Sequence, residues 1–233
     1  MLVFAHRGSS GVAPENTLSA FSLALADKVD GIELDVQVIE GVAMVIHNNW
    51  LQGTTTGMGR LDQVSLDYCL TLDAGDGQKI PSLEQVLKLV AGQCLVNIEI
   101  KAHNAEEVVV AVAKKAVNEF GFKAEQLIIS SFNLPALKRV GELAPEFPLG
   151  ALTANIPLDY AAFAEQVQAK TIHLNRDFIT PEFVDDSHKR GLKVYVYTVN
   201  YVEDIQLMLE MGVDGIFTDY PNRALDYLSS VEK

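Results

Sequence analysis

The sequence is poor in several features that would each indicate a particular class of protein. Only two of the 233 residues are cysteine, and Cys69 and Cys94 form neither a CxxC pair nor part of a histidine-containing metal pattern. We therefore expect two reduced thiols without a structural role, with a disulfide as the alternative. No internal repeat, low-complexity tract or proline-rich linker divides the chain, which favours a single domain.

Long apolar runs and basic residues are also scarce. Met1 leads directly into LVFAH without the regions of a signal peptide, and no later run could span a bilayer, so we expect a cytoplasmic protein. Eighteen lysines and arginines face 31 aspartates and glutamates, which gives a formal net charge of −13. Because such a charge repels polyanions, we expect no nucleic acid partner and no stable membrane association. The sequence makes no prediction of the oligomeric state.

What the sequence does contain is a regular alternation of short apolar runs with longer amphipathic stretches. The apolar, β-branched runs predict strands at residues 2–6, 31–36, 94–100, 126–132, 147–153, 171–175, 193–199 and 215–219. Between them, amphipathic patterns predict helices, for example over 15–28, 82–92 and 105–121. Eight such units fit an α/β fold of the (β/α)₈ TIM-barrel type. An open doubly wound sheet is less favoured, because no GxGxxG or GxxxxGK[ST] motif follows a strand.

One segment interrupts the alternation. Residues 37–80 separate the second predicted strand from the next helix, and we expect them to form a small insertion within a single catalytic domain of residues 1–233. The letters EGV at 40–42 indicate a hairpin turn, so MVIH at 44–47 is expected to fold back beside the second strand. An insertion at the carboxyl end of a barrel strand can cover an active site.

Ionisable residues collect where the predicted strands end. They are His6 and Arg7 after the first strand, Glu33 and Asp35 on the second, His47 after the hairpin strand, and Glu99 and Lys101 on the third. The carboxyl ends of barrel strands meet at one mouth, so we expect these side chains to form one site. Glu33 and Asp35 are two residues apart and therefore project from one face of their strand, as do Glu99 and Lys101.

The three carboxylates predict a cation site. Brought together at neutral pH, Glu33, Asp35 and Glu99 would repel one another and raise their own pKa values unless a cation neutralised them. Their oxygen ligands suit one divalent cation, Mg²⁺ or Ca²⁺, better than Zn²⁺, which usually recruits histidine or cysteine. Ion pairing of Glu99 with Lys101 or Arg7 is the alternative.

The remaining groups at this mouth suit acid–base chemistry on an anion. His6 and His47 can serve as acid and base because imidazole titrates near neutral pH. Arg7 and Lys101 beside a cation suit an anion with several oxygens, either phosphate or carboxylate. The glycines and serines at 8–11 would let the backbone approach that anion closely.

The same residues lie within a longer, ordered series of motifs. HRG at 6–8 is followed by PENT at 14–17, IELD at 32–35, IH at 46–47, NIEIK at 97–101, SSF at 130–132, YTVN at 197–200 and GVDGIFTDYP at 212–221. This series resembles the glycerophosphodiester phosphodiesterases and is most similar to their bacterial cytoplasmic branch.

The resemblance implies a TIM barrel with a small inserted subdomain. It also implies metal-dependent hydrolysis of glycerophosphodiesters, such as glycerophosphocholine and glycerophosphoethanolamine, to sn-glycerol 3-phosphate and an alcohol. By the same match, Glu33, Asp35 and Glu99 would hold the metal, and His6 and His47 would be the catalytic pair, in either order of acid and base. The implied substrate-binding residues are Arg7, Lys101, Asn16, Phe132 and Tyr197, with core packing as the alternative for the two aromatic residues.

The chain departs from the family pattern at the second histidine. Asn48 stands where the family usually has aspartate. If that carboxylate normally orients or charges the histidine, the pKa of His47 differs here.

Two other functions stay open. A lysophospholipase D-like phosphodiesterase would need an exposed apolar or basic docking surface, which the sequence does not reveal, and a noncatalytic phosphoester-binding barrel would not need paired histidines.

Overall fold

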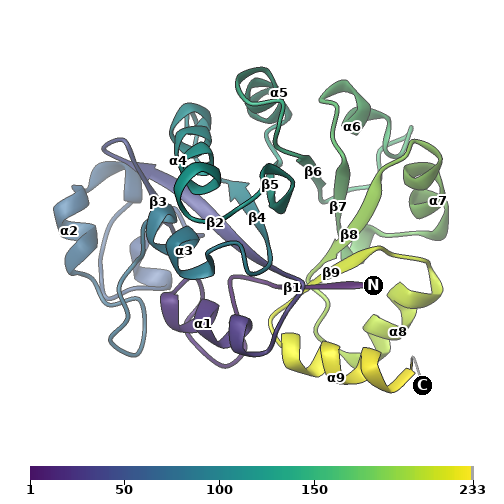
Figure 1. Cartoon of the computed structure of the whole chain (residues 1–233), viewed down its shortest axis with the longest axis horizontal. Coiled ribbons are helices and arrows are strands. Elements are labelled where there is room, and N and C mark those ends of the chain that lie inside the picture. The colour runs from purple at the N-terminus through teal and green to yellow at the C-terminus, as the bar shows by residue number, and fades with distance from the viewer. Residues whose placement is uncertain (232–233) are drawn as a thin grey trace.

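The strands close into a barrel in the computed structural model, which describes residues 1–231 (Figure 1). Within these residues eight parallel strands form the barrel: β1 (Leu2–Ala5), β2 (Gly31–Ile39), β4 (Leu95–Ile100), β5 (Leu127–Ser131), β6 (Leu149–Thr153), β7 (Thr171–Asn175), β8 (Lys193–Tyr197) and β9 (Gly215–Thr218). Strand β1 pairs with both β9 and β2, so the sheet has no gap at the point where the chain begins. The predicted (β/α)₈ barrel is confirmed.

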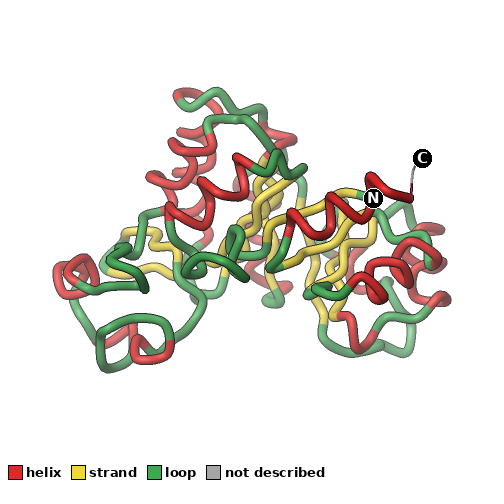
Figure 2. Tube along the Cα trace, turned by 90° about the horizontal axis from the view of Figure 1, so that it is seen from below, coloured by secondary structure: helices red, strands yellow, loops and turns green. Residues whose placement is uncertain are grey.

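Helices surround the strands (Figures 1 and 2). In chain order around the barrel they are α1 (Leu18–Ala26), α3 (Leu83–Val90), α4 (Glu106–Glu119), α5 (Leu134–Leu143), α6 (Ala162–Gln166), α7 (Pro181–Lys189), α8 (Val202–Glu210) and α9 (Pro221–Val231). Several begin at a side-chain cap, in which an oxygen of Thr17, Ser82, Asn133 or Thr180 accepts a hydrogen bond from a backbone N–H of the first turn. Because Thr17 and Ser82 are cap residues, α1 begins three residues after the start of its amphipathic pattern and α3 begins one residue after the start of its own.

The insertion after β2 begins with a hairpin. Strand β3 (Val42–Val45) runs antiparallel to β2, with Val45 opposite Val36. Glu40 and Gly41 make the turn with φ angles of +49° and +79°, the left-handed conformation of tight hairpin turns. The predicted hairpin is therefore confirmed.

The rest of the insertion has an apolar cluster of its own beside the barrel. Helix α2 (Leu66–Thr71) belongs to it and lies at the left of Figure 1. The buried residues of this cluster are Ile39, Met44, Ile46, Leu51, Leu61, Cys69, Leu72 and Ile80. We propose on this basis that residues 37–80 form a small subdomain of one catalytic domain.

The barrel interior is closed by aromatic side chains. Phe4, Tyr195 and Phe217 pack together there, with ring centroids 5.1 to 6.2 Å apart. His173 lies against the same rings, is fully buried, and places Nε2 2.9 Å from Thr171 Oγ1. Burial lowers the pKa of His173 to about 3, so this histidine is neutral and belongs to the floor of the barrel.

The two cysteines agree with the expectation of reduced thiols. Cys69 and Cys94 are both free and buried. Burial raises the pKa of the Cys94 thiol to about 12, as expected for an inert core thiol.

Among the helices of residues 1–231, none is both long enough and apolar enough to cross a membrane.

Candidate active site

A cavity of about 300 Å³ opens at the carboxyl ends of the barrel strands. Most of the predicted site residues line it, namely His6, Arg7, Glu33, His47, Glu99, Lys101, Phe132 and Tyr197. Asp35 and Asn16 are 1% and 4% exposed and lie behind this wall. The structure thus brings together side chains from strands that are distant in the sequence, as the barrel geometry predicts.

The three carboxylates form a compact buried cluster. One oxygen each of Glu33, Asp35 and Glu99 lies within 4.8 Å of the others. The register of β2 and β4 explains this closeness, because it pairs Asp35 directly with Glu99. Burial and the neighbouring carboxylates raise the pKa values of Glu33 and Glu99. The charged forms of Glu33 and Glu99 are therefore disfavoured in this cluster.

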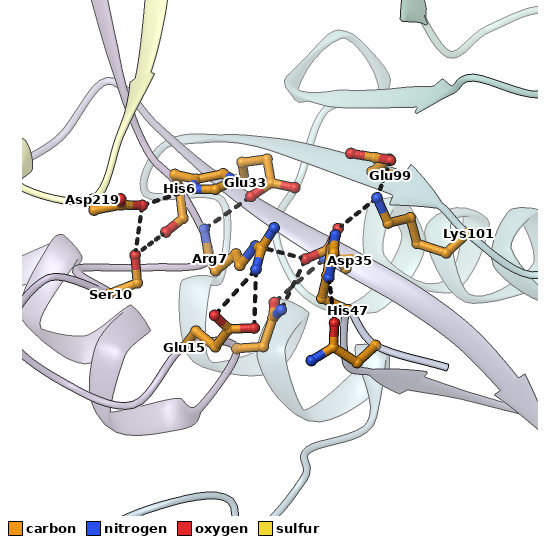
Figure 3. A network of polar contacts seen from close by, with 12 residues as sticks. His6, Arg7, Ser10, Glu15, Glu33, Asp35, His47, Glu99, Lys101 and Asp219 are labelled. Atoms are coloured by element: carbon orange, nitrogen blue, oxygen red, sulfur yellow. Dashed lines mark hydrogen bonds and ion pairs between the residues drawn. The ribbon is translucent and has the colours of Figure 1, made fainter. Parts of the chain in front are cut away.

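Two cationic side chains lie against this cluster (Figure 3). Lys101 Nζ is 2.7 Å from Glu99 Oε1 and 3.5 Å from Asp35 Oδ1. Arg7 Nε is 3.2 Å from Asp35 Oδ2, and Arg7 Nη1 donates to Glu15. The ion pairing that the sequence offered as an alternative is thus present for Glu99 and Lys101, whereas Arg7 pairs with Asp35 and Glu15. Burial would raise the pKa of Asp35, but these two cations lower it below its ordinary value.

The HRG segment holds the cluster in place through its backbone, and the PENT segment does so through the side chain of Asn16. Arg7 has a φ of +57°, and its backbone N–H donates to Glu33 Oε2 over 2.8 Å. Asn16, with a φ of +58°, donates from Nδ2 to Asp35 Oδ2 and accepts from the Asp35 backbone N–H. Glycine is required at position 8, because a Cβ there would lie 2.7 Å from the backbone of Ala20. Asn16 therefore positions Asp35 from behind the cavity.

His6 is held by a carboxylate that the sequence analysis did not identify. Its Nδ1 lies 2.6 Å from Asp219 Oδ1. Asn200 Nδ2 donates to Asp219 Oδ2 over 2.6 Å, and Ser10 Oγ lies 3.0 Å from Asp219 Oδ1. Burial opposes the charge on Asp219, but these contacts, led by His6, lower its pKa to about 2. Because the carboxylate only accepts, Nδ1 carries a hydrogen and Nε2 is left to exchange a proton.

His47 has a neutral partner instead. Its Nδ1 lies 2.9 Å from Asn48 Oδ1, so the asparagine occupies the place of the family's aspartate without the charge. Burial lowers the pKa of His47, and the nearby cations Arg7 and Lys101 lower it further against the opposing effect of Asp35. A histidine in this environment is neutral near pH 7.

Two aromatic residues form an apolar wall at the mouth. Phe132 follows β5 and Tyr197 ends β8, and their rings meet edge to face with centroids 6.1 Å apart. Tyr197 Oη donates to the backbone oxygen of Thr153, which fixes its ring. Phe132 is 45% exposed and lies with its ring centroid 5.7 Å from Lys101 Nζ. Phe132 therefore presents an apolar face to the mouth rather than to the core.

Comparison with known proteins agrees with this arrangement. Residues 6–223 match the model of the glycerophosphoryl diester phosphodiesterase family. The chain belongs to this family. It is therefore a glycerophosphodiester phosphodiesterase, and the family resemblance found in the sequence is confirmed.

Relatives of the chain match it over nearly its full length. A glycerophosphodiester phosphodiesterase of Caldanaerobacter subterraneus subsp. tengcongensis is 38% identical, over 97% of this chain and 96% of its own. One of Bacillus altitudinis is 35% identical, over 96% of both. Among solved structures, a phosphodiesterase of Oleispira antarctica in complex with the product sn-glycerol-3-phosphate superimposes with a TM-score of 0.90. It is 29% identical, over 98% of this chain and 97% of that one.

Proposed function

We propose that the cavity hydrolyses glycerophosphodiesters to sn-glycerol 3-phosphate and an alcohol, with one divalent cation and with His6 and His47 as the acid–base pair. The observation that carries this proposal is the convergence of two histidines, three carboxylates and two cationic side chains on one cavity of about 300 Å³. The product complex of the Oleispira antarctica relative supports it.

The residues of the carboxylate cluster fit a divalent cation. Glu33, Asp35 and Glu99 offer hard oxygen ligands, which suit Mg²⁺ or Ca²⁺. Asn97 lies opposite Glu33 in the sheet and lines the same cavity, and its Oδ1 is buried without a hydrogen-bond partner among the described residues. A bound cation would supply Lewis-acid stabilisation of charge on the phosphoryl oxygens.

Arg7 and Lys101 would hold the phosphate. Both line the cavity, and burial alone would lower their pKa values, but the surrounding carboxylates raise them above their ordinary range. The two side chains therefore remain charged while they face the substrate. A phosphodiester is an anion that resists attack, so positive groups fixed beside it lower the barrier by stabilising the charge of the transition state.

The two histidines differ in a way that suggests their roles. The ionised Asp219 accepts a hydrogen bond from His6 Nδ1 and fixes the ring with Nε2 free, so we assign to His6 the protonation of the leaving alcohol oxygen. The lowered pKa of His47 keeps its imidazole neutral, so we assign to His47 the removal of a proton from the attacking hydroxyl. That hydroxyl is either water, which gives glycerol 3-phosphate directly, or the 2-hydroxyl of the substrate glycerol, which gives a cyclic phosphate that water must then open.

The test is release of glycerol 3-phosphate from glycerophosphocholine and glycerophosphoethanolamine in Mg²⁺, Ca²⁺ or EDTA. We expect metal-dependent turnover that His6→Ala and His47→Ala each reduce by about 10²–10⁴-fold. His188→Ala is the matched control, because His188 pairs with Asp214 just before β9, at the opposite end of the barrel. Turnover unaffected by either cavity histidine would refute the assignment, and substrate binding without turnover would favour a binding protein.

A further inference from the structure

The loops after β5 and β6 form a second depression beside the cavity. It is a groove of about 700 Å³, and we call it the apolar groove. It shares Phe132, Leu152 and Ala154 with the cavity, and its other lining residues are Leu134, Ile156, Pro157, Leu158 and Phe163 together with the uncharged polar residues Thr153 and Asn155. The groove and the cavity therefore adjoin at the three shared residues.

Large apolar side chains are unusually exposed in this groove. Leu158 is fully exposed, and Ile156 and Phe132 are each 45% exposed. Scattered exposed apolar residues are common on proteins, but several of them around one depression mark a surface that binds something. Their position beside the cavity indicates that the occupant is part of the molecule bound there.

The chemistry of the apolar groove differs sharply from that of the cavity. No ionisable residue of the described chain lines the groove, whereas His6, Arg7, Glu33, Glu99 and Lys101 all line the cavity. A cationic headgroup such as choline or ethanolamine would find no carboxylate in the groove to pair with. A neutral, apolar group would instead be removed from water there.

We propose that the apolar groove binds the alcohol portion of the substrate, and that the enzyme favours glycerophosphodiesters whose alcohol is an apolar chain. This inference rests on the proposed function. The charged cavity suits the glycerol phosphate half, because its cationic side chains match the phosphate. The alcohol half then extends past Phe132, Leu152 and Ala154 into the apolar groove.

The expected size of the preference follows from burial. Full burial of one methylene group raises a binding constant about fourfold. A groove that is open on one side buries about half of the methylene surface, which corresponds to about twofold. We therefore expect kcat/KM to rise about twofold for each methylene added to the alcohol. Between the ethyl and hexyl diesters of glycerol 3-phosphate, four added methylenes predict a rise of about 16-fold.

The test measures kcat/KM for the ethyl, butyl and hexyl diesters at concentrations at which each is monomeric. We expect kcat/KM to rise along the series for the wild type, and to be equal for the three diesters in the double variant Ile156→Ser, Leu158→Ser. Both changes are at exposed positions, so the fold is retained. Leu207→Ser is the matched control, because Leu207 is 42% exposed on α8 and lies outside the apolar groove.

The outcomes separate failure of this inference from failure of the proposed function. No hydrolysis of any of the three diesters or of glycerophosphocholine would refute the function itself. Equal hydrolysis of all three diesters, or a rise that survives the double variant, would overturn the groove assignment alone. Preference for lysophosphatidylcholine over the hexyl diester would overturn it as well, because the chain would then lie on the glycerol side. A rise in kcat/KM that occurs only when phosphatidylcholine vesicles are present would likewise overturn the groove assignment, because the apolar residues would then contact a membrane surface.

Discussion

The pairing of His6 with Asp219 leads to a prediction about Asp219→Asn. The substitution keeps the shape of the side chain but removes its charge. An amide at this position cannot accept from both His6 Nδ1 and Asn200 Nδ2, because one of its two terminal atoms is itself a donor. Either the histidine or the asparagine then meets a donor in place of an acceptor.

The magnitude follows from the geometry of this contact. Nδ1 and Oδ1 are 2.6 Å apart, and the side chains of His6 and Asp219 are only 16% and 29% exposed, so the hydrogen bond is charge-assisted and partly shielded from water. Such bonds contribute about 1.5–3 kcal/mol. Because the contact fixes the ring and tautomer of His6 for proton transfer in the transition state, its loss should lower kcat by about 10- to 150-fold.

The assay compares kcat, with saturating metal, for glycerophosphocholine and for the p-nitrophenyl diester of glycerol 3-phosphate. Because the nitrophenolate oxygen leaves without a proton, impaired proton transfer from His6 should reduce kcat for the p-nitrophenyl diester much less than for glycerophosphocholine. The metal concentration for half-maximal activity should not change, because Asp219 lies outside the carboxylate cluster. Asp226→Asn, an exposed aspartate on α9, is the matched control.

Two results would refute the reasoning. A kcat within about twofold of the wild type would mean that the 2.6 Å contact contributes nothing to turnover. A large loss of kcat that is equal for the two substrates would mean that Asp219 supports the fold near His6 but not proton transfer from it.

Three further changes test other parts of the site. Asn48→Asp places a carboxylate 2.9 Å from His47 Nδ1. It should raise the pKa of His47 and move the ascending acid limb of kcat/KM to higher pH by about one unit, because the base must be neutral. Glu33→Gln should weaken Mg²⁺ and Ca²⁺ binding at least about tenfold by calorimetry, and should raise the melting temperature in EDTA because it relieves repulsion among buried carboxylates. Gly8→Ala forces a Cβ to 2.7 Å from the backbone of Ala20 at a φ of +81°. It should lower the free energy of unfolding in urea by about 2–4 kcal/mol.

Each of these three has a result that would contradict it. An acid limb that stays in place in Asn48→Asp would mean that His47 is not the group titrating there. Unchanged metal affinity in Glu33→Gln would remove that residue from the metal site. A loss below about 1 kcal/mol in Gly8→Ala would mean that the segment after β1 shifts easily away from α1.

The barrel and much of its site could be predicted because their signals are local. Each strand appears as an apolar run between turns, and the hairpin at residues 40–42 carries its own glycine. The convergence of Glu33, Asp35 and Glu99 then follows from the rule that parallel strands present their carboxyl ends to one mouth. No contact had to be known in advance.

What could not be predicted depends on neighbours that are distant in the sequence. Asp219 ends the last predicted strand just as His6 ends the first, but their pairing requires that β1 lies beside β9. That signal was available in the barrel prediction itself. The apolar groove left no such signal, because its residues come from the loops after two strands and from α6. Its shape depends on how those loops turn.

The closure of the sheet between β1 and β9 also sets when the protein becomes active as it is made. His6 leaves the ribosome well before Asp219, which follows 213 residues later. Until β9 has emerged and paired with β1, His6 lacks the carboxylate that fixes its ring. Contacts between such distant residues form late in folding, since the intervening chain must be ordered first. Turnover during refolding or translation would therefore report completion of the barrel, whereas the first strands and helices would report only its start.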